Sequence, residues 1–387
     1  MGYAIQEIRS DEELAALGPE WDELLAASRS NTIFLTREWL CEWRRCYRPH
    51  DPLRVVALRD GAGRLAGLAP LAADRVRVGP AGRFRALRLL GDGSWDSDYL
   101  DLICRAGEEP DVAAALLAHL DAAADWDVLL LNEVPADSPV LPALGEACRR
   151  RRYGIDETRY GCSYAPLPRE WDAFLAMLKP RFRTKVRSLL RSLGEASGEP
   201  PEYCRDAAEL DGWLETLFDL HTRRWQAIGQ AGVFGDARKR EFYRRMGRRF
   251  LERGWLRFSR LREGDRVVAM QFCFEYDNRT FLLQEGYDPD EAHRNAGHTL
   301  RALVFADNVR RGVAVYDFLG GVADHKLLWG AQVKEAVRLA ITRRGARGRL
   351  YRLLTHDVAR LKDAVRAAAP DWAIRAGKRV LRRGGGA

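Results

Sequence analysis

Hydrophobic positions in the first half of the chain follow two periods, one typical of strands and one typical of helices. Strand patterns cover residues 3–9, 53–58, 65–72, 85–90, 99–103 and 128–131. Helical patterns cover residues 10–25, 36–47 and 112–124. Because strands and helices alternate, we expect a mixed α/β fold for this half.

The second half begins near Pro166 and places most of its helices before its strands. Helical patterns cover residues 179–193, 207–228, 236–252 and 299–311. Strand patterns cover residues 255–261, 267–276, 280–287 and 313–319. Residues 55–71 and 256–274 share one local pattern, a strand, a charged turn with glycine and a second strand. This echo favours duplication of one α/β module within the chain.

Length and composition favour two folded domains. The chain has 387 residues, of which 47% are hydrophobic and 30% charged, and single cores stop growing at roughly 250–300 residues. We therefore expect a first module over residues 1–165, a second over 166–342 and a tail over 343–387. Seven scattered cysteines without a C-x-x-C pair predict buried thiols. No signal peptide or long apolar segment is evident, so we expect a cytoplasmic protein.

Positive charge is concentrated in the tail. From Arg343 to the end, 13 lysine and arginine residues face three aspartates, so the tail carries +10 and residues 1–342 carry −2 of the overall +8. A basic tail on a near-neutral body suits the phosphates of an anionic membrane surface or of nucleic acid. It would then hold the protein peripherally at the inner face of a membrane. A solvated helical extension without a partner is the alternative.

One turn between a strand and a helix is the clearest candidate for ligand binding. The strand pattern ends at Tyr287, Asp288 and Pro289 interrupt it, and a polar turn leads to a helix that begins near Thr299. The first turn of a helix has unpaired N–H groups and the positive end of the helix dipole, and Gly297 allows a ligand to approach the backbone closely. A diphosphate fits such a site. An ordinary turn is the alternative.

The sequence of this turn, R-N-A-G-H-T at residues 294–299, is similar to the R-x-x-G-x-G/A signature of the GNAT superfamily. In that superfamily the backbone of the turn holds the pyrophosphate of acetyl-CoA. The resemblance implies that acetyl-CoA, or another acyl-CoA, is a co-substrate. The residues that it implies for binding are Tyr287, Arg294, Asn295, Ala296, Gly297, His298 and Thr299. Thr299 departs from the signature, where glycine or alanine is usual.

A longer resemblance covers most of the chain up to about residue 335. The segments that carry it are F-L at 34–35, Trp39, D-S-D-Y-L-D-L at 96–102, R-x-W at 223–225, G-D-R-V-V-A at 264–269 and Y-D-F-L-G-G-V-A-D-H-K-L-L-W at 316–329. These look like the cellulose-biosynthesis-associated acetyltransferase family. The resemblance implies two tandem GNAT-like modules with mixed sheets flanked by helices, as in Fem-type aminoacyltransferases. It also implies a sugar, nucleotide-sugar or polysaccharide-related acceptor.

Acyl transfer to an amine requires groups that remove a proton, polarise the thioester carbonyl and protonate the leaving thiolate. Glu285 is a candidate base, either directly or through a water molecule. Because Glu285 alternates with Gln284, only one of the two can face the cleft. His325 is the alternative acid or base, since the ordinary pKa of histidine is near neutrality. Family members usually have a tyrosine where this chain has His325, directly before Lys326.

Asp317 lies in a predicted buried strand, where a carboxylate needs a partner. Lys326 or a backbone amide would be that partner if Asp317 is structural. In a catalytic arrangement, Asp317, His325 and Lys326 would instead lie together at the end of the strand and face the acyl group. His221 and Trp225 lie one helical turn apart and are candidates for lining an acceptor groove. Core packing is the alternative for Trp225.

Two further classes of function remain open. A Fem-like transferase that uses aminoacyl-tRNA would contact phosphates through the basic helix at 179–193 and through the tail. A non-catalytic module would bind polysaccharide-synthesis machinery or an anionic membrane through the tail. Metal chemistry is not indicated, because the sequence has no H-E-x-x-H motif and no Cys/His cluster. The absence of G-x-S-x-G argues against a serine hydrolase. The acyl group, the individual acceptor and the oligomeric state stay open.

Overall fold

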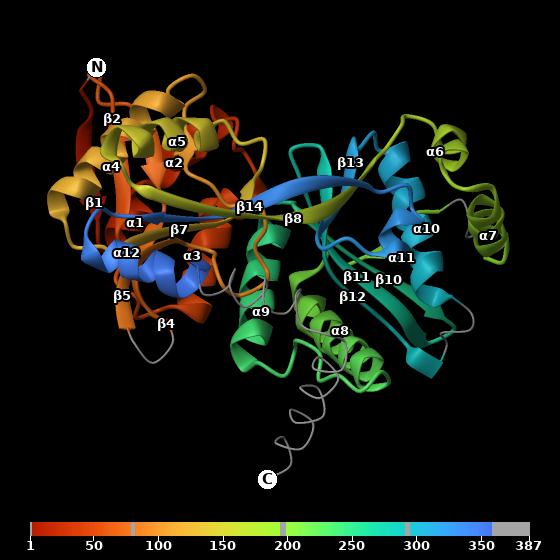
Figure 1. Ribbon diagram of the computed structural model, residues 1–387. Coiled ribbons are helices and arrows are strands. Elements are labelled where there is room, and N and C mark those ends of the chain that lie inside the picture. Colours follow the sequence, from red (N-terminus) through yellow and green to blue (C-terminus); the bar gives the residue numbers. More distant parts are fainter. Residues whose placement is uncertain (1, 79–81, 194–198, 291–294, 358–387) are drawn as a thin grey trace, which may run out of the picture.

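The computed structural model describes residues 2–78, 82–193, 199–290 and 295–357. Two α/β halves lie side by side, and two long strands, β8 (Gly154–Pro166) and β14 (Gln332–Thr342), run across the middle of the molecule and join them (Figure 1). The mixed α/β class predicted from the alternating patterns is confirmed.

The first half contains a small sheet and one end of a large sheet. Its helical elements are α1 (Asp11–Ala16), α2 (Gly18–Ala26), the 3-10 helix η1 (Ile33–Leu35), α3 (Arg37–Tyr47), α4 (Glu109–Ala123) and α5 (Val140–Arg151). Its strands before β8 are β1 (Ala4–Ile8), β2 (Val55–Arg59), β3 (Leu65–Ala69), β4 (Leu71–Val78), β5 (Gly82–Leu89), β6 (Ile103–Cys104) and β7 (Val128–Pro135). Strands β1, β2, β3 and β6 form a four-stranded antiparallel sheet.

The second half contains the remainder of the large sheet, with helices on both faces. Its helices are α6 (Trp171–Met177), α7 (Pro180–Arg191), α8 (Ala207–Gln226), α9 (Ala237–Glu252), α10 (Ala296–Arg310) and α11 (Asp324–Leu327). Its strands before β14 are β9 (Glu202–Tyr203), β10 (Leu256–Glu263), β11 (Arg266–Tyr276), β12 (Arg279–Tyr287) and β13 (Val315–Gly320). After β14 the chain forms α12 (Ala346–Arg352) and a short π-helical turn, η4 (Leu353–Asp357).

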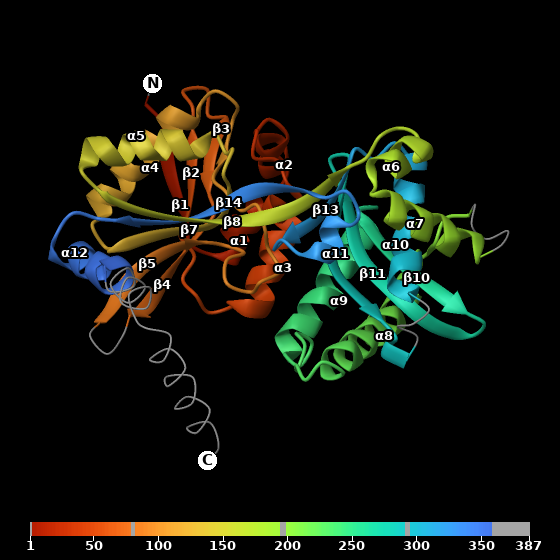
Figure 2. The same ribbon diagram turned by 45° about the vertical axis from the view of Figure 1, so that its right-hand side comes forward.

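The order of strands in the large sheet shows that the halves exchange a strand. The ten strands lie in the order β4-β5-β7-β14-β8-β13-β12-β11-β10-β9. β14 lies antiparallel between β7 and β8, so the last of the described strands completes the sheet of the first half. β8 in turn pairs with β13 through its last residues. The turned view shows both strands passing from one half to the other (Figure 2).

Aromatic side chains join the two halves into one continuous core. The ring of Trp39 on α3 lies 5.0 Å from Phe242 on α9 and 5.7 Å from Phe274 on β11. Phe34 lies 5.7 Å from Phe281 on β12. Burial of one such side chain contributes roughly 1.5–3 kcal/mol. These contacts across the interface therefore fix the halves relative to one another.

The residues at 99–103 form no extended strand, and that prediction is wrong. The segment is an irregular loop that reaches the small sheet only at β6, and Tyr99 has a φ of +53°. Its apolar side chains are buried because the loop is packed between the halves. By contrast, the predicted bounds agree within a few residues with the observed elements for α8, α9, β10, β11 and β12.

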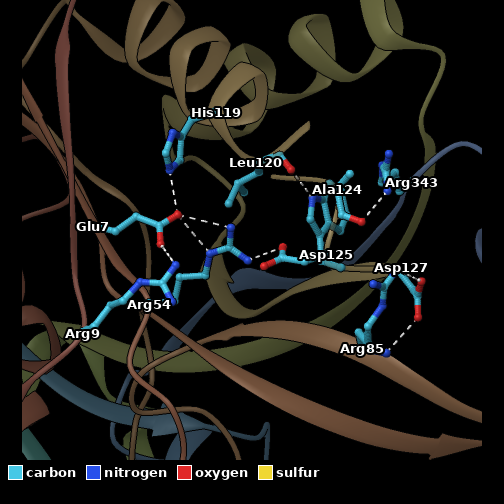
Figure 3. Close-up of polar contacts among 11 residues, drawn as sticks. Glu7, Arg9, Arg54, Arg85, His119, Leu120, Ala124, Asp125, Asp127 and Arg343 are labelled. Atoms are coloured by element: carbon cyan, nitrogen blue, oxygen red, sulfur yellow. Dashed lines mark hydrogen bonds and ion pairs between the residues drawn. The ribbon is translucent and has the colours of Figure 1, made fainter. Parts of the chain in front are cut away.

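The start of the basic tail is bound to the first half. Arg343 donates from its guanidinium to the carbonyl of Ala124 (2.9 Å), close to Asp127 (Figure 3). Asp127 forms ion pairs with Arg85 and Arg347, each at 2.9 Å. These basic residues are therefore used within the fold. Residues 358–387, which carry eight of the thirteen tail cations, lie outside the described residues.

A polar cluster fixes the small sheet to α4. Glu7 on β1 accepts hydrogen bonds from Arg54, and the Nε2 atom of His119 on α4 lies 2.7 Å from its carboxylate (Figure 3). Burial alone would raise the pKa of Glu7, but the hydrogen bond to His119 and the charges of Arg54 and Arg9 lower it. Arg54 also pairs with Asp125. The cluster thus links β1, the entry to β2 and the end of α4.

Two general features complete the fold. Within the described residues, no helix combines the length and the apolar character needed to cross a bilayer. Each of the seven cysteines, all of which lie in described segments, has a free thiol.

Candidate active site at the divergence of two parallel strands

β12 and β13 are parallel neighbours that separate after a short paired segment. Pairing joins residues 279–281 of β12 to residues 315–317 of β13. Beyond these residues β12 continues alongside β11, whereas β13 follows β8. A cavity of about 350 Å³ lies at this divergence, beside the first turn of α10.

Nine described residues line this cavity. They are Arg224, Glu285, Tyr287, Asn295, Ala296, Gly297, His298, Arg301 and His325. Seven of them are candidates chosen from the sequence, and Arg224 and Arg301 are additions. Arg294, also a candidate, lies outside the described residues.

The first turn of α10 presents its backbone to the cavity. The N-cap residue, Asn295, has a φ of +60°, in the left-handed region that asparagine tolerates better than most residues. The N–H groups of the next three residues have no acceptor within an α-helix, and the positive end of the helix dipole lies there. A Cβ atom on Gly297 would lie 3.2 Å from the Cδ1 atom of Tyr287. Glycine at this position thus allows the turn to pack closely on the Tyr287 ring.

Thr299 does not enter the cavity. Its side chain is only 5% exposed, and its hydroxyl and N–H both donate to the carbonyl of Asn295, at 3.3 and 2.9 Å. The departure from the GNAT signature at this position therefore leaves the width of the cavity unchanged.

A buried ion pair forms one wall of the cavity. Glu285 on β12 pairs with Arg301 on α10, and Arg224 on α8 lies 3.6 Å from the same carboxylate. Burial alone would raise the pKa of Glu285, but the charges of Arg301 and Arg224 bring it below its ordinary value. Glu285 is therefore ionised at neutral pH and is a weak base.

Only one of the two neighbouring candidates on β12 faces the cavity. Glu285 is the register partner of Gln271, and Gln284 is the partner of Phe272. A shift in register follows directly, between Phe272 and Cys273. Glu285 lines the cavity, whereas Gln284 faces the opposite side of the sheet, toward Tyr243.

Two histidines in the cavity are neutral at neutral pH. Burial, followed by the charge of Arg301, lowers the pKa of His325. Burial, followed by the charges of Lys185 and Arg301, lowers the pKa of His298 to about 4. The His298 ring is stacked on Trp329, with ring centroids 6.0 Å apart. His325 is therefore able to accept a proton at neutral pH.

Asp317 does not line this cavity, contrary to the catalytic arrangement considered from the sequence. Its carboxylate is completely buried and accepts hydrogen bonds from the hydroxyl of Tyr99 (2.9 Å), the Nζ atom of Lys334 (2.8 Å) and the N–H of Leu319 (2.8 Å). The charged partner of Asp317 is therefore Lys334 on β14 and not Lys326, and the backbone amide considered from the sequence is that of Leu319. Because Tyr99 belongs to the first half, this carboxylate joins the halves.

Lys326 also serves the fold. Its Nζ atom donates to the carbonyls of Phe318 (3.0 Å), Gly320 (2.7 Å) and Gly321 (3.0 Å). It thereby satisfies backbone acceptors at the end of β13. Of the three residues expected to act together, the structure brings only His325 to the cavity.

His221 and Trp225 on α8 do not line the cavity either. The Nε1 atom of Trp225 donates to the Nε2 atom of His221 (2.8 Å), and the buried His221 ring lies 4.8 Å from Phe234. A Cβ atom on Gly286 of β12 would lie 2.9 Å from the backbone nitrogen of His221. Glycine at 286 therefore lets α8 approach β12, which brings Arg224 to the cavity.

Arg224 and Arg301 were not predicted as cavity residues, and they differ in how far the sequence could have indicated them. Arg301 lies four residues after Gly297, so helical periodicity alone places both on one face of α10. Arg224 is the middle residue of the R-x-W segment, and its position depends on the packing of α8 against β12. Only the first of the two could be found without the structure.

Comparison with known proteins agrees with this geometry. Residues 180–327 match the model of the acetyltransferase (GNAT) domain family. No curated protein sequence matches the chain. The solved structure of FemX is similar over 90% of this chain and 99% of its own, with a TM-score of 0.60 and 12% identity. A conserved protein of unknown function from Bacteroides thetaiotaomicron VPI-5482 is similar over 87% of this chain and 100% of its own, with a TM-score of 0.54 and 15% identity.

The described residues that line the cavity all fall within the matched segment. The chain therefore has a mixed α/β fold similar to that of FemX, and its residues 180–327 are similar to the acetyltransferase (GNAT) domain.

Proposed function

We propose that this protein is an acyltransferase that transfers the acyl group of an acyl-CoA, in the first place acetyl-CoA, to an amine or hydroxyl group. The observation that carries the proposal is the cavity at the divergence of β12 and β13, closed on one side by the first turn of α10. A helix N-terminus favours anions, and the separated strands leave room for an extended ligand.

The charge of the cavity suits a diphosphate. Arg224 and Arg301 together face a single carboxylate, that of Glu285, so the wall keeps a net positive charge.

The proposed chemistry assigns different tasks to His325 and Glu285. His325, neutral at neutral pH, takes a proton from the acceptor amine or hydroxyl as its nitrogen or oxygen attacks the thioester carbonyl. That proton then passes to the sulfur as the carbon–sulfur bond breaks. Glu285 remains ionised and holds Arg301 in place. A route through a water molecule to Glu285 is the less favoured arrangement, because its low pKa makes it a poor base.

The acceptor class rests on the sequence resemblance, which favours a sugar, nucleotide-sugar or polysaccharide-related molecule. Aminoacyl-tRNA is the second candidate donor, favoured by the likeness of the fold to FemX and by the basic face of α7. A non-catalytic role, through polysaccharide-synthesis machinery or an anionic membrane, would depend on the tail beyond residue 357. A cytoplasmic location, peripheral to a membrane, remains part of the proposal.

Binding of the donor is tested directly with CoA and acetyl-CoA. We expect both to raise the melting temperature of the full chain and to release heat in calorimetric titration. Arg224→Ala should weaken binding by about tenfold, since a lost charged contact costs on the order of 1.4 kcal/mol. Arg187→Ala is the charge-matched control, because Arg187 is an exposed residue of α7 that lies outside the cavity.

The outcomes separate the candidates. If no acyl-CoA binds to the wild-type chain, the acyl-CoA proposal is wrong. Salt-sensitive binding of tRNA, lost when the cations of α7 are replaced, would instead support an aminoacyl-tRNA donor.

A further inference from the structure

A second cavity, of about 660 Å³, lies between the two halves. It is formed by the end of α3, the loop at 93–95 and the segment that leads into α9. It shares no lining residue with the cavity of Glu285. Acyl transfer as proposed above does not use it.

Trp95 lines this second cavity, and both its exposure and its backbone conformation are unusual for a tryptophan. Its side chain is 82% exposed, and its backbone has a φ of +63°, in the left-handed region. For a bulky side chain that backbone conformation is unfavourable, and it is typically kept only where surrounding structure enforces it. The guanidinium of Arg338 lies 5.7 Å from the ring and covers one side of it. The remaining surface of a large aromatic side chain is thus held open to solvent.

The loop that carries Trp95 is fixed by its neighbours. Asp96 is buried and accepts from the Nζ atom of Lys239 (2.5 Å) and from the hydroxyl of Tyr47 (2.7 Å). Ser94, on the other side of Trp95, accepts from the Nε1 atom of Trp43 (2.8 Å). These partners come from α3 and α9, so both halves of the molecule hold the loop. The backbone that carries the indole is therefore fixed before any ligand arrives, which reduces the entropy lost on binding.

Two neutral ion pairs line the cavity beside the indole. Arg48 pairs with Asp51 (3.3 Å), and Arg238 pairs with Asp236 (2.8 Å). All four side chains remain at least partly exposed. Each pair offers hydrogen-bond donors and acceptors but no net charge. An anionic ligand would have to compete with the two carboxylates, and a purely apolar ligand would remove water from the pairs without replacing its hydrogen bonds.

We propose that this cavity binds a neutral saccharide. The apolar face of a pyranose ring packs on the indole of Trp95, and its hydroxyl groups bond to the Arg48–Asp51 and Arg238–Asp236 pairs. A pyranose has one apolar face, which suits an exposed aromatic ring. It also has a rim of hydroxyl groups, which suit the neutral ion pairs beside that ring. This binding does not depend on the acyl transfer proposed above. It would hold a saccharide chain at the interface of the halves, outside the cavity of Glu285.

The test uses the full chain and three neutral probes, cellotetraose, chitotetraose and maltotetraose. Calorimetric titration and intrinsic tryptophan fluorescence should both detect binding of at least one of them. Trp95→Ala should weaken that binding by about tenfold or more. Asp236→Asn should also weaken it, because asparagine keeps the N-cap of α9 but not the charge that pairs with Arg238. Ile228→Ser is the control, since Ile228 is 64% exposed and lies outside this cavity.

Three results would overturn the inference. One is that the folded wild-type chain binds none of the three saccharides at millimolar concentration. Another is that Trp95→Ala, with an unchanged melting temperature, binds them as the wild type does. The third is that Trp95 is required only for binding to phosphatidylglycerol vesicles, which would make this surface a membrane contact. Binding of CoA should be the same in Trp95→Ala and wild type, so failure here is distinguishable from failure of the acyl-CoA proposal.

Discussion

His325 lies in the cavity beside the Glu285–Arg301 pair, and its protonation state decides whether it can act as a base. Burial and then the charge of Arg301 lower its pKa, so the neutral form persists to a lower pH than for an ordinary histidine. We therefore expect kcat to stay high as the pH falls to about 6.5, the ordinary pKa of histidine, and to decline only at lower pH.

His325→Ala should lower kcat by roughly 10²–10⁴-fold and remove the acidic limb of the pH profile. The affinity for acyl-CoA should change little, which separates loss of the base from loss of binding. A pH profile of the same shape in this variant would show that another group is the base.

Because Glu285 and Arg301 form an ion pair, changing either residue alone should lower the free energy of unfolding. Arg301→Met leaves the carboxylate of Glu285 with only the more distant Arg224 as a charged partner and should cost about 3–5 kcal/mol of unfolding free energy. The double variant Arg301→Met/Glu285→Gln should recover much of that loss, because no buried charge is left unpaired.

Urea denaturation at pH 7.5 measures both effects. The pKa of Glu285 is lowered in the folded state, so its contribution to stability is present above its unfolded pKa and is lost as the pH falls through the folded value. The contribution of the pair should thus shrink in acid. Equal stability of the single variant and the wild type would contradict the buried pair.

At the scale of elements, the position of α8 against β12 decides whether Arg224 reaches the cavity. A Cβ atom at Gly286 would meet the backbone nitrogen of His221 at 2.9 Å, so Gly286→Ala should push α8 outward. We expect a loss of about 1–3 kcal/mol in unfolding free energy, as for other overpacked sites, and weaker binding of CoA.

Gly212→Ala, a glycine-to-alanine change on α8 itself, is the matched control. A Cβ atom at Gly212 meets nothing within 4 Å, so this variant should be stabilised by about 0.5–1 kcal/mol through helix propensity. If both alanine variants behave alike in denaturation and in CoA titration, the close approach of α8 to β12 is not a constraint.

At the scale of the whole molecule, folding of the first half depends on β14, which follows the second half in the sequence. β7 and β8 are both paired with β14 and are not neighbours without it. A fragment of residues 1–166 should therefore lack a cooperative unfolding transition and be cleaved rapidly by protease. The same fragment fused through a flexible linker to residues 330–357 should regain both properties. A stable 1–166 fragment would show that the exchanged strand is dispensable.

Elements were predictable where the determinant is local. The helices α8 and α9 and the strands β10, β11 and β12 follow the 3.6- and 2-residue periods of their own side chains. The first turn of α10 was predicted from Gly297 and its neighbours, because the residues that form such a turn are consecutive in the chain. Six other cavity residues followed from the same stretch or from nearby candidates on β12 and α11.

β8 and β14 were missed because their patterns depend on partners from the other half. β14 reads as a charged segment, and only pairing on both sides makes it a strand. For a related reason, the sequence alone could not show that Asp317 lies outside the cavity. Its neighbours Tyr316 and Phe318 face the core beside α10, so Asp317 faces the first half. There Tyr99 and Lys334 donate hydrogen bonds to it.

The sequence by itself determined the α/β class, most elements of the second half and the turn at the start of α10, since each depends on residues close together in the chain. Tertiary structure alone decided that β14 completes the first half, that Arg224 joins the cavity and that Asp317 and Lys326 do not. It also decided that Trp95 stands exposed between the halves. These features depend on contacts between residues up to more than two hundred positions apart, which no local period in the sequence encodes.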